Sequence, residues 1–199
     1  MPSALSDTAA TLPSGGLHMR PHNCLRLSLV VVVACLVHGL TTSAASALDN
    51  ASLPPQVAEV RELILSAVRS GNLDDLRSAI EPDAMRPDFG LPPSDDAIAE
   101  LKGASVDGAG HETLAALGEI LDMPPAALPL GKDIENNLIY VWPYLAERSI
   151  DTLTAAEHVD LYRLVPAAKV KQMQDKKRWM WWRLAIGADG SWIMFKKME

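Results

Sequence analysis

The chain has 199 residues, a length that suggests one folded domain behind any targeting segment. It contains 25 Asp and Glu against 18 Lys and Arg, for a formal net charge of −7, and this acidic balance argues against a nucleic-acid partner. Its 2 cysteines, Cys24 and Cys35, both precede the stretch that we expect to fold, so we expect neither a disulfide framework nor thiol chemistry.

Residues 19–47 have the pattern of a secretory signal peptide. Two arginines precede the apolar run LSLVVVVACLVHGL, and Ala-Ser-Ala at 45–47 fits cleavage by signal peptidase. The run is too short, and too interrupted by a histidine and a glycine, for a transmembrane helix. We therefore predict a leader over 1–47 and a single globular domain over 48–199, which is periplasmic or secreted after cleavage near Ala47 and has no membrane span.

Two alternatives for the leader stay open. Val-Val-Ala-Cys at 32–35 has the pattern of a lipoprotein cleavage box, in which Cys35 would carry a lipid anchor. Residues 1–18 are rich in small and polar residues and would extend the chain ahead of the signal peptide, so Met19 is an alternative initiator.

The first half of the domain predicts a series of short amphipathic helices, because apolar residues recur there every three or four positions. Prolines, glycines and capping residues mark the helix ends. Residues 83–93 and 124–137 show no such period and are expected to be loops. The predicted helices cover 55–69, 73–80, 96–102 and 111–121.

The second half opens with a predicted strand at 138–142, five apolar residues followed by Pro143. Thr154 and Glu157 then have the spacing of a capping box, which predicts a helix from there to about residue 164. A further helix is expected over 167–174. The first of these two helices places Val159, Tyr162 and Val165 on one side.

Residues 177–197 predict a β-hairpin. This stretch holds four of the five tryptophans, and Asp189-Gly190 between two apolar runs favours a tight turn. We expect the strand at 138–142 beside the hairpin, because a third strand makes a sheet that can pack on helices. The predicted fold class is α+β, with several short helices packed on a small antiparallel sheet that includes this C-terminal hairpin.

Two turn types are compatible with the hairpin sequence. A two-residue loop pairs Leu184 with Phe195 and sets Arg183 against Lys196, which is an unfavourable like-charge pair. A three-residue loop with Gly190 in the left-handed conformation avoids that pair, and we favour it. Its pairs are Ile186 with Trp192, Leu184 with Met194, and Arg183 with Phe195.

Alternation along the first hairpin strand places Met180, Trp182, Leu184 and Ile186 on a core face and Trp179, Trp181, Arg183 and Ala185 on the other. The second face is either a binding platform for sugars or peptides or the cover for a helix. Trp142-Pro143-Tyr144 likewise either lines a groove or forms a buried corner. The candidate binding residues are Trp142, Tyr144, Trp179, Trp181 and Arg183.

Charge is divided unevenly along the domain. Residues 48–160 contain 21 Asp and Glu against 7 Lys and Arg, a net of −14, whereas residues 161–199 contain 3 against 9, a net of +6. The basic part either packs against the acidic body or forms a face for an anionic partner in the envelope, such as a lipid headgroup or a wall polymer. Another periplasmic protein is an alternative partner.

The sequence predicts no catalytic, metal or cofactor motif. His111 and His158 each lie beside a glutamate, but neither has the histidine spacing of a metal site. We expect a non-enzymatic binding or interaction module without cofactors. The alternative hypothesis is an envelope hydrolase that uses Glu157, His158 or His111 as its general base.

Three segments carry a family resemblance: Arg-x-x-Ile-Gly-x-Asp-Gly-x-Trp at 183–192, Val-Trp-Pro-Tyr at 141–144 and Arg-Pro-Asp-Phe-Gly at 86–90. With them the chain resembles a family of small uncharacterised exported proteins of alphaproteobacteria. The family's chains close with Val-Ala-Gly-Asp, whereas this one ends with Lys-Lys-Met-Glu at 196–199. The resemblance implies a bacterial envelope location and carries no known activity.

Overall fold

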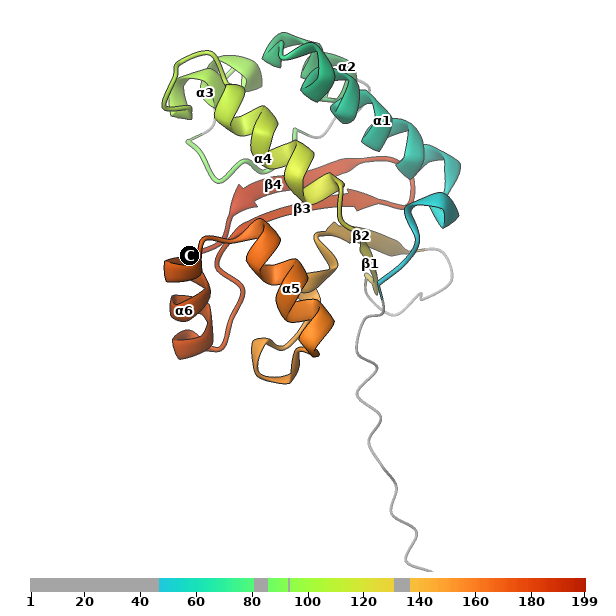
Figure 1. The fold of residues 1–199 in the computed structure, drawn as a ribbon. Helices are drawn as coiled ribbons and strands as arrows, with labels where there is room; N and C mark the ends of the chain where they lie inside the picture. Colours follow the sequence, from blue (N-terminus) through green and yellow to red (C-terminus); the bar gives the residue numbers. More distant parts are fainter. Residues whose placement is uncertain (1–46, 81–85, 93, 131–136) are drawn as a thin grey trace, which may run out of the picture. The chain divides into compact units, whose positions relative to one another are not determined.

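The computed structural model describes residues 47–80, 86–92, 94–130 and 137–199 (Figure 1). The predicted signal peptide, apart from its last residue Ala47, and the alternative lipoprotein box lie outside these residues. No helix within the described ranges is both long and apolar enough to cross a membrane.

The fold is α+β, as the sequence predicted, with helices packed on an antiparallel sheet that ends in a hairpin. The α-helices are α1 (Pro55–Ser70), α2 (Arg77–Ile80), α3 (Ala97–Ala104), α4 (His111–Leu121), α5 (Ala155–Leu164) and α6 (Ala167–Lys176). The strands are β1 (Ala126–Pro129), β2 (Leu138–Trp142), β3 (Trp182–Gly187) and β4 (Trp192–Lys197). Short 3₁₀ helices are η1 (Asn50–Ser52), η2 (Leu73–Leu76), η3 (Tyr144–Glu147) and η4 (Ile150–Thr152).

Local side-chain caps fix several helix starts where the sequence predicted them. The Thr154 hydroxyl accepts from the Glu157 amide and the Glu157 carboxylate accepts from the Thr154 amide, so the predicted capping box is present. The Asp96 carboxylate caps α3 by accepting from the amides of Ile98 and Ala99. The helix predicted over 73–80 is instead a 3₁₀ turn, η2, followed by the single turn of α2.

The strands lie in the order β1-β2-β3-β4, so β2 lies beside the hairpin as predicted. The prediction of a loop over 124–137 was wrong for Ala126–Pro129, which form the edge strand β1. Its sequence, Ala-Ala-Leu-Pro, has no β-branched or aromatic residue, and its pairing with β2 makes it a strand. Both outer edges are partly covered, because Ala47 bridges to Ala126 and Asp88 bridges to Met194.

The hairpin combines the two predicted registers. Gly190 has φ +91° and closes a three-residue loop, and Ile186 pairs with Trp192 as favoured. A β-bulge then leaves Ile193 as an extra residue on β4. Beyond the bulge Leu184 pairs with Phe195 and Arg183 with Lys196, so our preferred pairing was wrong there and the like-charge pair is present.

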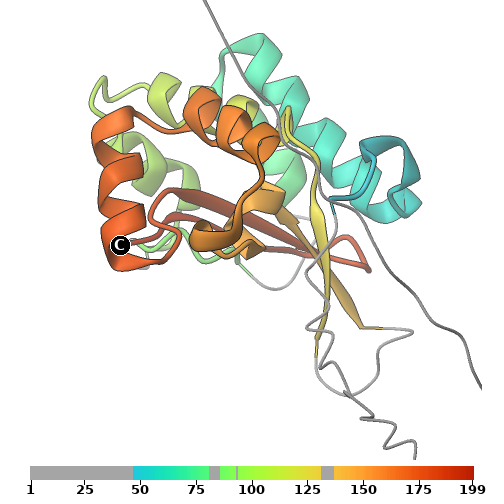
Figure 2. The ribbon, with the colours of Figure 1, turned by 60° about the horizontal axis from the view of Figure 1, so that its bottom comes forward.

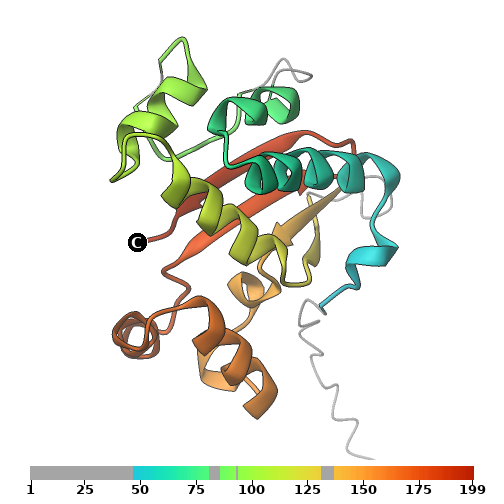
Figure 3. The same ribbon diagram turned by 45° about the horizontal axis from the view of Figure 1, so that its top comes forward.

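The helices of the first half cover one face of the sheet, where α1 and α4 lie over the strands (Figures 1 and 3). We call the apolar interior between them the first core. Its largest fully buried side chains include Ile64 and Leu117 from the helices and Trp142, Trp192 and Phe195 from the sheet.

A second core lies between η3, η4, α5, α6 and residues 179–180, on the side where the chain ends (Figure 2). Helix α5 buries Leu161 and Leu164 in it. Val159 and Tyr162, which the sequence placed on one side with Val165, point to solvent instead, with exposed fractions of 61% and 54%. Val165 alone of those three is buried.

Candidate interaction surface

Trp142 and Tyr144, the first two predicted binding residues, lie in the interior. Trp142 has no exposed surface, and its indole nitrogen donates to the Asn50 side chain at 3.3 Å. Tyr144 is also buried, and its hydroxyl donates to Asp160 Oδ2 at 3.0 Å. These two side chains form the buried corner that the sequence left as an alternative, and neither lines a groove.

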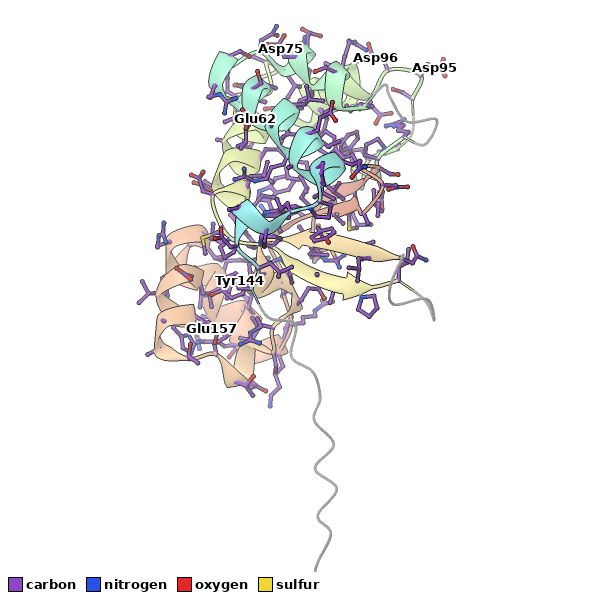
Figure 4. All side chains as sticks on the ribbon, turned by 90° about the vertical axis from the view of Figure 1, so that its right-hand side faces the viewer. Glu62, Asp75, Asp95, Asp96, Tyr144 and Glu157 are labelled. Atoms are coloured by element: carbon purple, nitrogen blue, oxygen red, sulfur yellow. The ribbon has the colours of Figure 1, made fainter. Side chains whose placement is uncertain are left out.

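The Tyr144 phenol is held protonated. Burial, followed by the hydrogen bond to Asp160, raises the pKa of Tyr144 well above its ordinary value. The phenol therefore serves as a permanent donor to Asp160 on α5, which ties η3 to that helix. Figure 4 shows Tyr144 and Glu157 in this same part of the molecule.

Trp179 and Trp181 both pack on the second core, and the predicted alternation does not extend back to residue 179, because β3 begins only at Trp182. Trp179 is 8% exposed and lies in the second core together with Met180, although the sequence placed these two on opposite faces. Trp181 is partly exposed, and the Lys197 ammonium lies 4.5 Å from its ring centroid.

Arg183 is held by Glu147 at the end of η3. Its Nε and one terminal nitrogen donate to Glu147 Oε1 at 2.9 and 2.6 Å, and both side chains are 20% exposed. Lys196, its cross-strand neighbour, pairs with Asp88. Two carboxylates from outside the hairpin thus offset the like-charge pair, and the guanidinium is already occupied.

The carboxylate of Glu157 is structural. Its two oxygens accept from the Thr154 amide and from the Arg148 guanidinium, and it is buried. The backbone hydrogen bond at Thr154 and the bonds from Arg148 lower the pKa of Glu157. Both carboxylate oxygens thus hold the start of α5 and the segment around Arg148 in place.

The two histidines belong to different helices. His111 begins α4, is exposed, and has its Nδ1 2.6 Å from Asp107 Oδ2. His158 lies on α5, which packs in the second core. The part of the chain that the structure describes contains no group of three or more His, Cys, Asp or Glu residues placed to hold a metal ion.

Most cations of the basic C-terminal part are paired with carboxylates. The paired ones are Arg163 with Asp160, Lys171 with Asp175, Lys177 with Asp151, Arg183 with Glu147 and Lys196 with Asp88.

Three exposed cations near the end of α6 and β4 have no carboxylate partner within the described ranges. They are Lys176 in the last turn of α6, Arg178 just after it, and Lys197, which lies over Trp181. We call Lys176, Arg178, Trp181 and Lys197 the basic corner, since the first three lie within six consecutive residues at the end of α6 and Lys197 contacts Trp181. The cations near the end of α6 are also favoured by the negative end of the helix dipole, a role that leaves their outer surface free.

The sequence pointed to Trp181 and to the basic C-terminal part, but not to this set of free cations. Which cations stay free depends on carboxylates far away in the chain, such as Glu147 and Asp88. Comparison with protein-family models, with curated proteins and with solved structures finds no match. The family resemblance stays a prediction.

Proposed function

We propose that this chain is an exported, non-enzymatic binding module that contacts an anionic component of the cell envelope through the basic corner. The observation that carries the proposal is the distribution of ion pairs. In the stretch 144–198, each Asp and Glu has a cationic or hydrogen-bonding partner. By contrast, Lys176, Arg178 and Lys197 have no carboxylate partner among the residues that the structure describes.

A cation without an internal carboxylate partner can bind an external anion without first giving up an ion pair. Paired cations such as Arg183 would have to exchange one partner for another, with little net gain. The partly exposed ring of Trp181 adds a flat apolar surface beside the charges. The leader pattern supports an envelope location, where anionic polymers and lipids are available.

The test compares two charge reversals of equal size. In one, Lys176→Glu, Arg178→Glu and Lys197→Glu remove the basic corner. In the matched control, Arg163→Glu, Lys171→Glu and Lys177→Glu reverse three cations that are already paired. Binding to polyphosphate, to an anionic polysaccharide and to anionic vesicles is measured by fluorescence titration at low and high salt.

We expect the corner variant to lose roughly a hundredfold in affinity, at about 1 kcal/mol for each cation near an anionic surface. The control should lose far less, and binding of the wild type should weaken with salt. Equal losses in both variants, or no binding of the wild type to any of the three probes, would overturn the proposal.

A further inference from the structure

The outer face of α5 presents an apolar stripe next to α6. Val159 and Tyr162 are one helical turn apart and lie opposite the buried Leu161 and Leu164, since each residue advances about 100° around a helix. They are two of the four large apolar side chains that are strongly exposed among the described residues; the others are Val106 and Leu130. Exposed apolar residues that share one face mark an interaction site more often than scattered ones do.

Free cations lie on the adjoining helix. α6 packs against α5, and the two helices are joined only through Val165 and Pro166 (Figures 1 and 2). Lys169 in the first half of α6 has no carboxylate partner in the described part of the chain, and it shares one flank of α6 with Lys176, seven residues further on. Helices α5 and α6, which pack against each other, thus carry the exposed Val159 and Tyr162 on α5 and the unpaired Lys169 and Lys176 on one flank of α6.

We infer, on the basis of the proposed function, that the anionic partner is the headgroup layer of a lipid bilayer. Val159 and Tyr162 insert into this layer, while Lys169 and the basic corner contact the headgroups. A soluble polyanion can neutralise cations, but it offers no apolar phase for a valine and a tyrosine that point away from the protein. A bilayer surface supplies both, and tyrosine suits the depth of the headgroups because its ring is apolar and its hydroxyl polar. Binding of this kind lies on the membrane and needs no spanning helix.

The experiment separates the apolar contribution from the charge. Vesicles rich in phosphatidylglycerol and vesicles of phosphatidylcholine are sedimented with the wild type and with Val159→Ser/Tyr162→Ser. The matched control is Val106→Ser/Leu130→Ser, which removes the other two strongly exposed apolar side chains. Polyphosphate binding is measured in parallel, and circular dichroism checks that each variant folds.

We expect the wild type to bind phosphatidylglycerol vesicles and not phosphatidylcholine vesicles. The Val159/Tyr162 variant should bind the anionic vesicles about tenfold more weakly, while its polyphosphate binding and the vesicle binding of the control stay unchanged. Wild-type binding to polyphosphate without binding to vesicles would overturn the inference and leave the proposed function standing. Unchanged vesicle binding of the Val159/Tyr162 variant would also overturn the inference. So would concentration-dependent dimers of the wild type that this variant abolishes, because the face would then be an interface between two copies. Absence of binding to every probe would overturn the proposed function itself.

Discussion

The first and second cores share one sheet but differ in the charge around them. The helices of the first core carry the acidic excess, and Figure 4 shows Glu62, Asp75, Asp95 and Asp96 among the side chains of that part. Around the second core, Glu147, Asp151, Glu157, Asp160 and Asp175 each pair with a cation, whereas several cations have no carboxylate partner among the described residues.

Ion pairs connect different kinds of segment around the two cores. Around the first core, ion pairs join α3 and its cap to the segments before it: Arg86 binds Glu100, Arg77 binds Asp96, and Lys102 binds Asp74 at 2.6 Å. Around the second, Arg148 and Arg183 anchor η3 and the segment after it to α5 and β3. Apolar burial therefore stabilises both cores, whereas the charges that remain unpaired determine which surface attracts an anion.

Truncating one leucine in each core gives the largest expected effect and tests whether the two cores unfold as one unit. Leu117 and Leu161 are both fully buried, so Leu117→Ala and Leu161→Ala should each lower the free energy of unfolding by about 2–5 kcal/mol. Urea denaturation followed by circular dichroism and by tryptophan fluorescence measures this loss. Since the sheet joins the cores, both probes should report one transition. Two separated transitions in Leu161→Ala would show that the second core is an independent unit.

Removing the charge of Glu157 should weaken the second region at neutral pH. Glu157→Gln leaves the Arg148 guanidinium half-buried without its carboxylate, and we expect a loss of about 1–3 kcal/mol in the free energy of unfolding.

The loss should depend on pH. Because folding lowers the pKa of Glu157, its ionisation stabilises the fold fully above its unfolded pKa, about 4.3, and this contribution disappears as the pH falls through the lower folded pKa. The stability difference between wild type and Glu157→Gln should therefore shrink on acidification, as measured by denaturation at pH 7 and pH 3. A difference that is constant with pH would contradict this role.

Glu147→Gln tests how the hairpin tolerates its like-charge pair. Without the Glu147 carboxylate, Arg183 faces Lys196 across the strands, and we expect a loss of about 1 kcal/mol that is partly recovered at high salt. The control is Glu62→Gln, which breaks the solvent-exposed ion pair with Arg69. It should change the free energy of unfolding by less than about 0.5 kcal/mol. Equal effects of the two changes would mean that the Arg183 pair contributes no more than an exposed one.

Lys197→Met gives the smallest expected effect on stability. The ammonium over Trp181 contributes about 0.5 kcal/mol at an exposed site. We expect a small fall in the denaturation midpoint and a change in tryptophan emission. Lys169 has no aromatic contact and no carboxylate partner among the described residues, so Lys169→Met should leave the emission unchanged.

Features that depend on neighbouring residues in the chain were predicted from the sequence, whereas features that depend on distant partners were not. The ends of α4 and β2 and the capping box of α5 were predicted because periodicity, prolines and caps act within a few residues. Strand β1 was missed because its alanines carry no strand signal without β2. On α5, the stripe with Val159 and Tyr162 and the stripe with Leu161 and Leu164 are both apolar, so only packing selected the buried one.

The α+β class and most helix bounds follow from the sequence, which also favoured the three-residue turn at Gly190, since these features depend on local conformational preference. The bulge in β4, the burial of Trp142, Tyr144 and Trp179, and the set of unpaired cations became known only from the packed fold. The physical reason is that partners distant in the chain made these choices, as Glu147 did for Arg183 and Asp88 for Lys196.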